Sequence, residues 1–261
     1  MKNLSRVAFA GMIMLAPAPV LAAAPAPAPE PAPSKPAIAV DAAERGKIES
    51  VIRDLLDREP EIVLKAAKDA YGREEAKAQE KARQEISQNR DALVKSAHGS
   101  EAGNPKGDVT VVEFFDYQCG HCRSAHGTVA KLISEDSNVR VIYRHMPILG
   151  EASGWMAFAA IAAQQQGKFK QMHDAMMTVK SPQTKESLIK MAEGAGLDVA
   201  KFTKALDSSE SKAALTQDVM LAKTLNINGT PAFIIGDQMF SGELPLEQFK
   251  SVIAEQRKKK S

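Results

Sequence analysis

The 261-residue sequence predicts an α/β domain preceded by an α-helical N-terminal segment. Two runs rich in β-branched and aromatic residues, 108–115 and 139–145, enclose a stretch in which apolar residues recur at helical spacing. A strand, a helix and a second strand in this order indicate a parallel pair with a right-handed connection. Upstream, residues 41–71 carry apolar side chains at three- and four-residue intervals, which is typical of amphipathic helices.

The first residues have the features of a secretory signal peptide. Lys2 and Arg6 precede a short apolar stretch that ends in small residues, so we predict a signal peptide over residues 1–23. The stretch contains Pro17 and Pro19 and is too short to span a bilayer as a helix. Prolines at alternate positions then predict an extended Pro/Ala-rich tether over residues 24–40. Export would place the cysteines where disulfides form and persist.

The charge of the chain is nearly balanced, with 34 basic and 32 acidic residues. Lys2 and Arg6 lie in the predicted signal peptide, which contains no acidic residue, so the remainder carries a net charge near zero. Proteins that bind nucleic acid display a strongly basic surface. We therefore expect no nucleic-acid partner.

Residues 41–71 predict two amphipathic helices, which Glu59 and Pro60 separate because proline fits the first turn of a helix. Helices this short cannot bury an apolar face alone, so they either pack on the larger domain or associate with copies of themselves. Residues 72–100 predict a charged helical linker, which has no core of its own in its first half. A solvated linker favours self-association, and we predict that residues 41–71 are an oligomerisation segment.

Residues 101–261 predict the larger domain. A helical block follows its second strand and forms an insertion over about residues 151–226. Two further strands, 232–235 and 238–241, are joined by Gly236 and Asp237, a favourable two-residue hairpin turn. Pro245 then opens a final helix with one apolar face.

The two cysteines, Cys119 and Cys122, stand at the expected start of a helix and are separated by Gly120 and His121. A helix N-terminus presents unpaired N–H groups and partial positive charge, which favour a thiolate on Cys119 more than on Cys122. A protonated His121 would add to this effect. Such a thiolate attacks disulfides and also leaves readily, so we predict Cys119 as the attacking thiol and Cys122 as the resolving thiol.

Three other uses of the cysteine pair have to be weighed. A structural disulfide would close a tiny loop and constrain the unfolded chain little. Haem attachment needs a histidine directly after Cys122, where the sequence has Arg123. A zinc or copper site would need ligands from His126, His145 or the methionines, and the sequence has no second cysteine pair and no tight histidine pair. We therefore predict no metal site and no cofactor.

The segment EFFDYQCGHC and the distant segment GTPAF resemble the DsbA-like branch of the thioredoxin superfamily, over about residues 107–256. The resemblance implies a thioredoxin fold with a helical insertion. It implies that Cys119 attacks a disulfide and that Cys122 resolves the product. Gly120 and His121 occupy the dipeptide that tunes the reduction potential in such enzymes.

Three further residues acquire a role from this resemblance. Thr230 and Pro231 match a loop whose proline is cis, lies against the cysteines and offers backbone groups to a substrate peptide. Glu113 lies six residues before Cys119, as an acid does in this family. A carboxylate in so apolar a strand is costly to bury unpaired, so we expect a raised pKa and a role in moving the proton of Cys122. The alternative is an acid that reaches solvent at the end of the strand.

The Gly-His dipeptide resembles that of the eukaryotic disulfide isomerases. The helical N-terminal region with its charged connector resembles that of suppressor-of-copper-sensitivity C (ScsC)-like proteins. Strongly oxidising relatives tend to carry proline in the dipeptide. The resemblance implies an oligomeric disulfide isomerase or reductase that a membrane thiol reductase supplies with electrons. We therefore predict an exported, periplasmic thiol–disulfide isomerase that acts on misoxidised envelope proteins as a homo-oligomer, with a trimer as one candidate. A monomeric DsbA-like dithiol oxidase and a copper-binding envelope protein are the alternatives.

Overall fold

The computed structural model describes residues 41–95, 99–179, 181 and 183–260. The predicted signal peptide and tether lie outside the described residues. The chain divides into two compact units, one that ends at Val63 and one that begins at Leu64. The described part of the first unit is residues 41–63.

The first unit contains helix α1 (Ala42–Arg58) and the first residues of helix α2 (Glu61–Gln88). A reciprocal capping box starts α1: the N–H of Glu44 donates to the Asp41 carboxylate at 2.8 Å, and the N–H of Asp41 donates to the Glu44 carboxylate at 3.2 Å. Glu59 and Pro60 separate the two helices, as the sequence predicts.

The apolar face of α1 has no partner within its own unit. No residue of α1 is buried, and Val51 is 66% exposed. Ile48 and Ile52, which share the face with Val51, are 46% and 48% exposed. Exposed apolar residues this close together are typical of an interaction surface.

One sheet forms in the described part of the second unit, with five strands in the order β1-β3-β2-β4-β5. β2 and β3 are parallel, whereas the other neighbouring strands are antiparallel. The structure confirms the four predicted strands. The edge strand β1 was not predicted, because three residues are too few to show the alternation of apolar and polar residues that indicates a strand. The bounds are Glu101–Gly103 (β1), Val109–Phe115 (β2), Val139–His145 (β3), Ala232–Ile235 (β4) and Gln238–Ser241 (β5).

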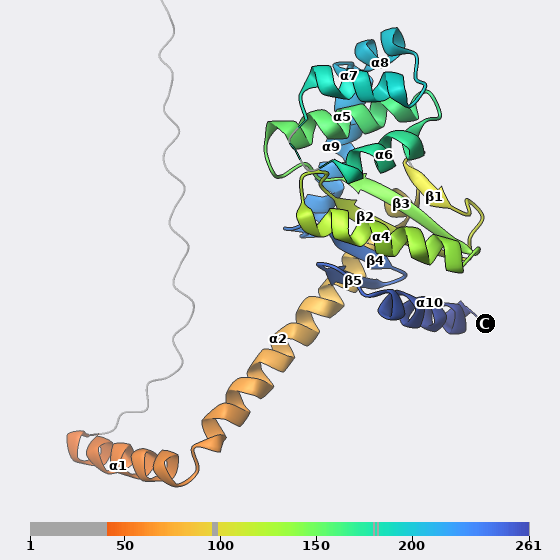
Figure 1. The fold of residues 1–261 in the computed structure, drawn as a ribbon. Coiled ribbons are helices and arrows are strands. Elements are labelled where there is room, and N and C mark those ends of the chain that lie inside the picture. The colour runs from red at the N-terminus through yellow and green to blue at the C-terminus, as the bar shows by residue number, and fades with distance from the viewer. Residues whose placement is uncertain (1–40, 96–98, 180, 182, 261) are drawn as a thin grey trace, which may run out of the picture. The chain divides into compact units, whose positions relative to one another are not determined.

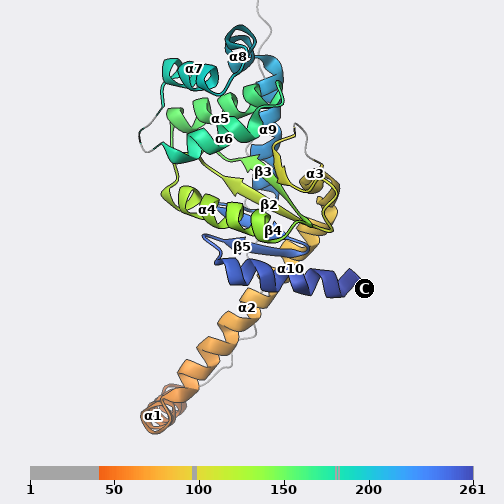
Figure 2. The same ribbon diagram turned by 45° about the vertical axis from the view of Figure 1, so that its right-hand side comes forward.

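Helices cover both faces of this sheet, and Figures 1 and 2 show α4 (Gly120–Glu135) and α9 (Ser209–Thr224) on opposite sides of it. Alternate residues of β2 point to opposite faces. Val111 and Phe115 belong to the core that α4 and α10 (Leu246–Lys260) also line. Val112 and Phe114 belong to a second core, to which α9 contributes. The central strand is therefore buried from both sides.

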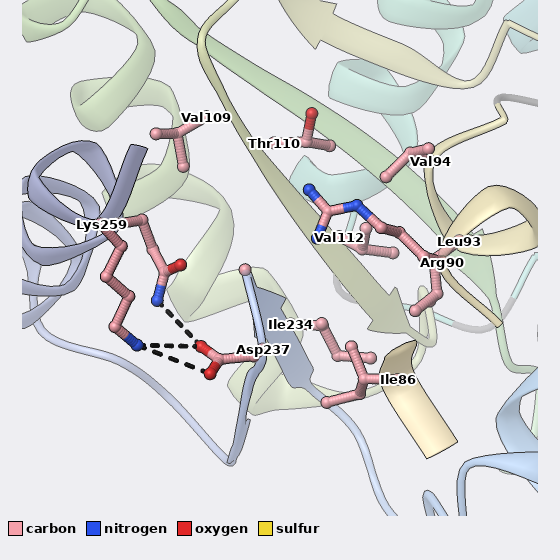
Figure 3. Close-up of a pocket in the computed structure, with 12 residues that line it drawn as sticks. Ile86, Arg90, Leu93, Val94, Val109, Thr110, Val112, Ile234, Asp237 and Lys259 are labelled. Carbon is pink, nitrogen blue, oxygen red and sulfur yellow. Dashed lines mark hydrogen bonds and ion pairs between the residues drawn. The ribbon is translucent and has the colours of Figure 1, made fainter. Parts of the chain in front are cut away.

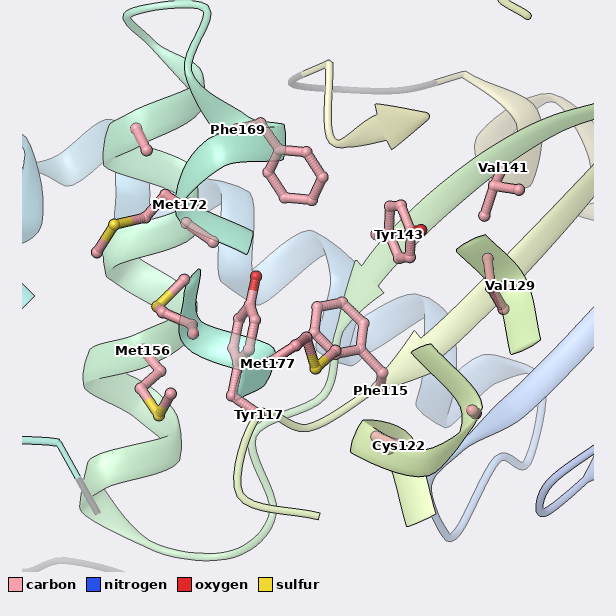
Figure 4. Close-up of a cluster of buried hydrophobic side chains, with 14 of the residues drawn as sticks. Phe115, Tyr117, Cys122, Val129, Val141, Tyr143, Met156, Phe169, Met172 and Met177 are labelled. Atoms are coloured by element: carbon pink, nitrogen blue, oxygen red, sulfur yellow. The ribbon is translucent and has the colours of Figure 1, made fainter. Parts of the chain in front are cut away.

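The stretch predicted as a helical insertion contains α5 (Glu151–Gln164), α6 (Phe169–Thr178), α7 (Lys185–Gly194), α8 (Val199–Leu206) and α9. Helices α5 to α8 share the core of α4 and do not form a separate one, whereas α9 contributes Leu221 and Ala222 to the second core. Figure 4 shows Phe115 and Tyr143 on the strands and Phe169, Met156 and Met172 on the helices to their left, and the rings of Tyr143 and Phe169 lie 5.6 Å apart. The insertion thus packs directly on the sheet end that carries the cysteines.

The end of the predicted charged linker departs from expectation. Helix α2 continues to Gln88 without a break at residue 71, and α3 (Arg90–Val94) follows it. Ile86 and Leu93 are each 2% exposed and pack in the second core with Val112. The last part of the 72–100 segment therefore belongs to the domain. Its apolar partners come from the distant sheet, and local sequence could not reveal them.

A buried ion pair fastens this segment to the domain. Arg144 on β3 is 4% exposed, and its guanidinium donates to the Asp218 carboxylate on α9 at 2.9 Å. The same guanidinium donates to the main-chain oxygens of Leu93 at 3.1 Å and Lys95 at 2.7 Å. Asp218 also accepts from the N–H of His145 at 2.9 Å. One arginine therefore joins the sheet, α9 and the end of α3.

A pocket of about 280 Å³ lies beside this junction, and Figure 3 shows it between the end of α2, the sheet and α10. Ile86, Val112 and Ile234 form its apolar wall. Lys259 and Asp237 close one end through an ion pair of 3.3 Å. Neither cysteine lines this pocket, so the candidate site lies elsewhere.

Replacing the buried arginine tests this anchor. We expect Arg144→Met to lower the free energy of unfolding by about 3–5 kcal/mol, because Asp218 would remain buried without its cation. Lys131→Met is the control, since its pair with Glu135 is largely exposed and should contribute no more than about 1 kcal/mol. Urea unfolding measures both, and equal losses in the two variants would contradict the anchor.

Candidate functional site

The two cysteines lie where β2 ends and α4 begins. Cys119 is the N-cap residue of α4, and Cys122 lies in its first turn. Both are free thiols, 8% and 0% exposed respectively. No side chain caps this helix, so its first N–H groups and their partial positive charge face the position of the Cys119 sulfur.

The loop before β4 closes over Cys119. The peptide bond between Thr230 and Pro231 is cis. The Cys119 thiol donates to the main-chain oxygen of Thr230 at 3.3 Å, across 111 residues of sequence. The structure therefore brings together the cysteine and the Thr-Pro loop that the sequence resemblance paired.

The two residues between the cysteines are exposed at the surface of the site. A side chain at Gly120 would meet no atom within 4 Å. The imidazole of His121 is 77% exposed, and its Nδ1 lies 2.6 Å from a carboxylate oxygen of Glu243. The Ser124 hydroxyl donates to the other oxygen of Glu243 at 2.7 Å. These contacts with His121 and Ser124 hold the pKa of Glu243 below its ordinary value.

Glu243 was not among the predicted site residues. It lies in the segment between β5 and α10, far from the cysteines in sequence. Only the packing of α10 against α4 brings its carboxylate to His121. No local pattern could have identified it.

Asp116, directly after β2, was also missed and fixes the loop that leads to the cysteines. It is 2% exposed, and one carboxylate oxygen accepts from the N–H of Gln118 at 2.7 Å. The other oxygen accepts from the N–H groups of Ile148 at 2.8 Å and Leu149 at 3.0 Å. Asp116 therefore joins the cysteine loop to the loop after β3. Its place at the end of a buried strand was the available sequence signal.

Glu113 is buried in the middle of the sheet. It is 1% exposed, and neither of its oxygens has a hydrogen-bond partner among the described residues. Burial, with a smaller contribution from the charge of Cys119, raises the pKa of Glu113 from its ordinary 4.5 to about 8. The expected raised pKa is thus found, and the alternative of an acid that reaches solvent is not.

The two thiols differ in their environment. Burial is the main cause that raises the pKa of Cys122 far above its ordinary value, and the nearby Glu113 carboxylate adds to the shift. Cys119 instead contacts the Thr230 carbonyl at the helix N-terminus. A thiol has to lose its proton before it reacts, and burial makes this harder for Cys122.

Known proteins that are similar to this chain have the same kind of fold. The family model of the DSBA-like thioredoxin domain matches residues 110–254. A thioredoxin-like oxidoreductase from Silicibacter pomeroyi is 40% identical, with a TM-score of 0.62 over 65% of this chain and 98% of that one. The thiol-disulfide exchange protein alpha-DsbA2 from Wolbachia pipientis is 28% identical, with a TM-score of 0.64 over 68% and 96%. Proteus mirabilis ScsC in a transitional conformation is 25% identical, with a TM-score of 0.63 over 84% and 100%.

Curated relatives are much longer proteins. The Na(+)/H(+) antiporter NhaA 3 of Salinispora tropica is 29% identical over 153 residues, which are 58% of this chain and 24% of that protein. NhaA of Herminiimonas arsenicoxydans is 28% identical over 158 residues, 60% of this chain and 25% of that protein. The chain thus spans about a quarter of these relatives. In the part of the chain that the structure describes, no helix combines the length and the apolar character needed to cross a membrane.

The raised pKa of Glu113 has a measurable consequence for stability. The folded carboxyl keeps its proton between pH 4.5 and about 8 whereas the unfolded one loses it, so the reduced protein loses stability as pH rises through this window. We expect Glu113→Gln to match the wild type at pH 4 and to be more stable by roughly 5 kcal/mol above pH 8.

Denaturant unfolding across this pH range measures the difference. Glu193→Gln, at an exposed helical position, is the control and should follow the wild type throughout. A constant difference between Glu113→Gln and the wild type at all pH values would contradict the assignment.

Proposed function

Because the chain belongs to the DSBA-like thioredoxin domain family, we propose that it is a thiol–disulfide oxidoreductase that works through Cys119 and Cys122. The observation that carries the proposal is the contact of 3.3 Å between the Cys119 thiol and the Thr230 carbonyl, beside a cis Pro231 and at the start of α4. A thiol in this position is adjacent to backbone groups that can hold an extended peptide.

The proposed reaction begins when the Cys119 thiolate attacks one sulfur of a substrate disulfide. A Cys119–substrate disulfide forms, the substrate disulfide breaks and the second substrate sulfur leaves as a thiolate. In isomerisation, that thiolate attacks a different disulfide of the substrate, which forms a new substrate disulfide and releases another substrate thiolate. A substrate thiolate then attacks the Cys119–substrate disulfide, so that a substrate disulfide forms and Cys119 leaves as a thiolate. In reduction, Cys122 attacks Cys119 instead, which releases the reduced substrate and leaves a Cys119–Cys122 disulfide. Two electrons from a reductant then restore both thiols.

Glu113 is proposed to take the proton of Cys122 in the resolving step. A thiol whose pKa is strongly raised by burial needs a base before it can act. A carboxyl with a pKa of about 8 can accept and return a proton near neutral pH, and it lies on the strand that leads to the cysteines. The stability that the protein loses by burying Glu113 would then be explained by this role in proton transfer.

The surroundings of Cys119 have proposed roles in recognition and tuning. We assign the backbone of Thr230 and Pro231 to binding a substrate segment. Gly120 and His121 are assigned to setting the reduction potential, with Glu243 holding the imidazole through its 2.6 Å contact. His121 is exposed, so its imidazole can also contact a peptide that approaches Cys119.

We propose isomerase or reductase activity in preference to simple dithiol oxidation. The Gly-His dipeptide lacks the proline typical of strongly oxidising relatives. The exposed apolar face of α1 also needs a partner, and a second copy of the same face is complementary in chemistry. Several sites on one scaffold raise the effective concentration for a second encounter with a misoxidised substrate. A monomeric dithiol oxidase is the alternative.

The cellular setting belongs to the same proposal. An exported, periplasmic protein would meet misoxidised envelope proteins as substrates. An isomerase there must be kept reduced against an oxidising environment. We therefore propose a membrane thiol reductase as the electron donor.

The roles of the two thiols can be separated by trapping. We expect Cys122→Ser to accumulate a Cys119–substrate disulfide, because the resolving thiol is missing, and Cys119→Ser to form none. Non-reducing electrophoresis and mass spectrometry of the adduct measure this with a peptide disulfide. An adduct through Cys122 in the Cys119→Ser variant would overturn the assignment.

The assembly can be tested by placing a charge on the apolar face of α1. We expect Val51→Glu to reduce the solution mass to that of a monomer and to lower reactivation of a scrambled multi-disulfide protein about tenfold or more. Oxidation of a small dithiol peptide should not change, because the cysteines remain intact.

Ser50→Glu adds the same charge at a polar position of α1 and is the matched control, which should keep the wild-type mass and activity. Light scattering gives the mass, and recovery of the scrambled protein's activity gives the isomerase rate. A monomeric wild type that oxidises the peptide but does not reactivate the scrambled protein would favour the oxidase alternative.

A further inference from the structure

Three potential metal ligands meet between the cysteine-bearing helix and the helical insertion. His126 lies on α4, and His173 and Asp174 lie on α6. One ligand atom from each side chain can be chosen so that all three lie within 4.8 Å of one another. His126 is also one helical turn beyond Cys122, so the cluster is next to the candidate site without sharing its cysteines.

Each of the three side chains has a buried polar atom with no hydrogen-bond partner among the described residues. These atoms are His126 Nδ1, His173 Nε2 and Asp174 Oδ1. His126 Nε2 lies 3.5 Å from Asp174 Oδ1, which is long for a charge-assisted hydrogen bond. Leaving one buried polar atom unsatisfied costs about 1–3 kcal/mol, and three in one place need an explanation.

The surroundings of His173 orient it as a ligand. It is fully buried, and its Nδ1 lies 2.9 Å from the Tyr117 hydroxyl. When Nδ1–H donates to Tyr117, Nε2 keeps its lone pair and can bind a metal ion, which is the usual outer-shell arrangement for a metal-bound histidine. Figure 4 shows the Tyr117 ring extending from the sheet end towards the insertion helices.

The charge around the cluster leaves one carboxylate oxygen for a cation. Lys170 pairs with the outer oxygen of Asp174 and leaves Oδ1 for the cluster. The side chains of His126 and Asp174 are 18% and 40% exposed, which provides a path from solvent.

Although the sequence predicted no metal site, we propose that His126, His173 and Asp174 form a binding site for a divalent transition-metal ion of the Zn²⁺ type. Two imidazole nitrogens and one carboxylate oxygen are a ligand set that suits Zn²⁺, and the exposed side leaves a fourth position for water. A bound ion would satisfy the three orphan atoms together. It would also join α4 to α6 and so fix the cysteine-bearing helix against the insertion.

Zinc binding should be measured on the untagged protein with Cys119 and Cys122 oxidised to a disulfide, so that the thiols cannot bind the metal. We expect one Zn²⁺ per chain by calorimetry or by competition with a chromogenic chelator. His126→Ala and Asp174→Asn should each weaken binding at least about tenfold. Asp207→Asn is the matched control, because Asp207 also pairs with a lysine, Lys185, in the insertion and should not affect binding.

Two further measurements keep the result independent of folding. Circular dichroism of each variant without metal should match the wild type, since His126 and Asp174 are only partly buried. Added Zn²⁺ should raise the melting temperature of the wild type and of Asp207→Asn but not of His126→Ala. Absence of stoichiometric binding in the wild type, or unchanged affinity in both ligand variants, would overturn the proposal.

Discussion

The pairing of β2 with β3 and β4 is the constraint on which the rest of the domain depends. In the antiparallel β2–β4 pair, Phe114 lies opposite Ala232, so β4 begins where β2 ends. The segment that enters β4 contains the cis bond before Pro231, and the segment that leaves β2 reaches Cys119. The pairing of the strands therefore brings the Cys119 thiol to the Thr230 carbonyl, 111 residues away in sequence. A shift in the register of β4 would move its side chains to the other face and separate the two loops.

The same strand carries the main local cost of the site. Glu113 lies on the face of β2 that Val111 and Phe115 also occupy, inside an apolar core. Without a hydrogen-bond partner among the described residues, its carboxyl is stable there only with its proton. Replacing Glu113 by an apolar residue would remove this cost, but it would also remove the carboxyl group that we propose to accept the proton of Cys122. Buried titratable groups with strongly shifted pKa values, which lower stability, are common at catalytic sites.

The sequence was sufficient to predict features that depend on short-range pattern. The strands at 108–115 and 139–145, the hairpin at Gly236 and Asp237 and the helix that starts at the cysteines all follow from spacing and turn chemistry. The features that it did not reveal depend on long-range packing. Glu243 reaches His121 because α10 packs on α4, and His126 reaches α6 because the insertion folds back over the sheet. Neither juxtaposition leaves a periodic or local signal in the chain.

Helix α2 is exposed to solvent over residues 72–81 and buried near its C-terminal end, and the sequence predicted only the exposed part. Near its end, Ile86 is held in the second core, and the Arg144 pair secures α3 directly after it. Residues 72–81, by contrast, are all exposed, and pairs such as Lys77 with Glu74 stabilise them by only a few tenths of a kcal/mol each. Gly72 weakens the helix by about a further 1 kcal/mol relative to alanine. A solvated helix without tertiary packing is marginal, so local opening of this stretch costs far less than opening the domain. The fold therefore keeps the cysteines rigid and concentrates the low-cost motion in the segment that precedes them.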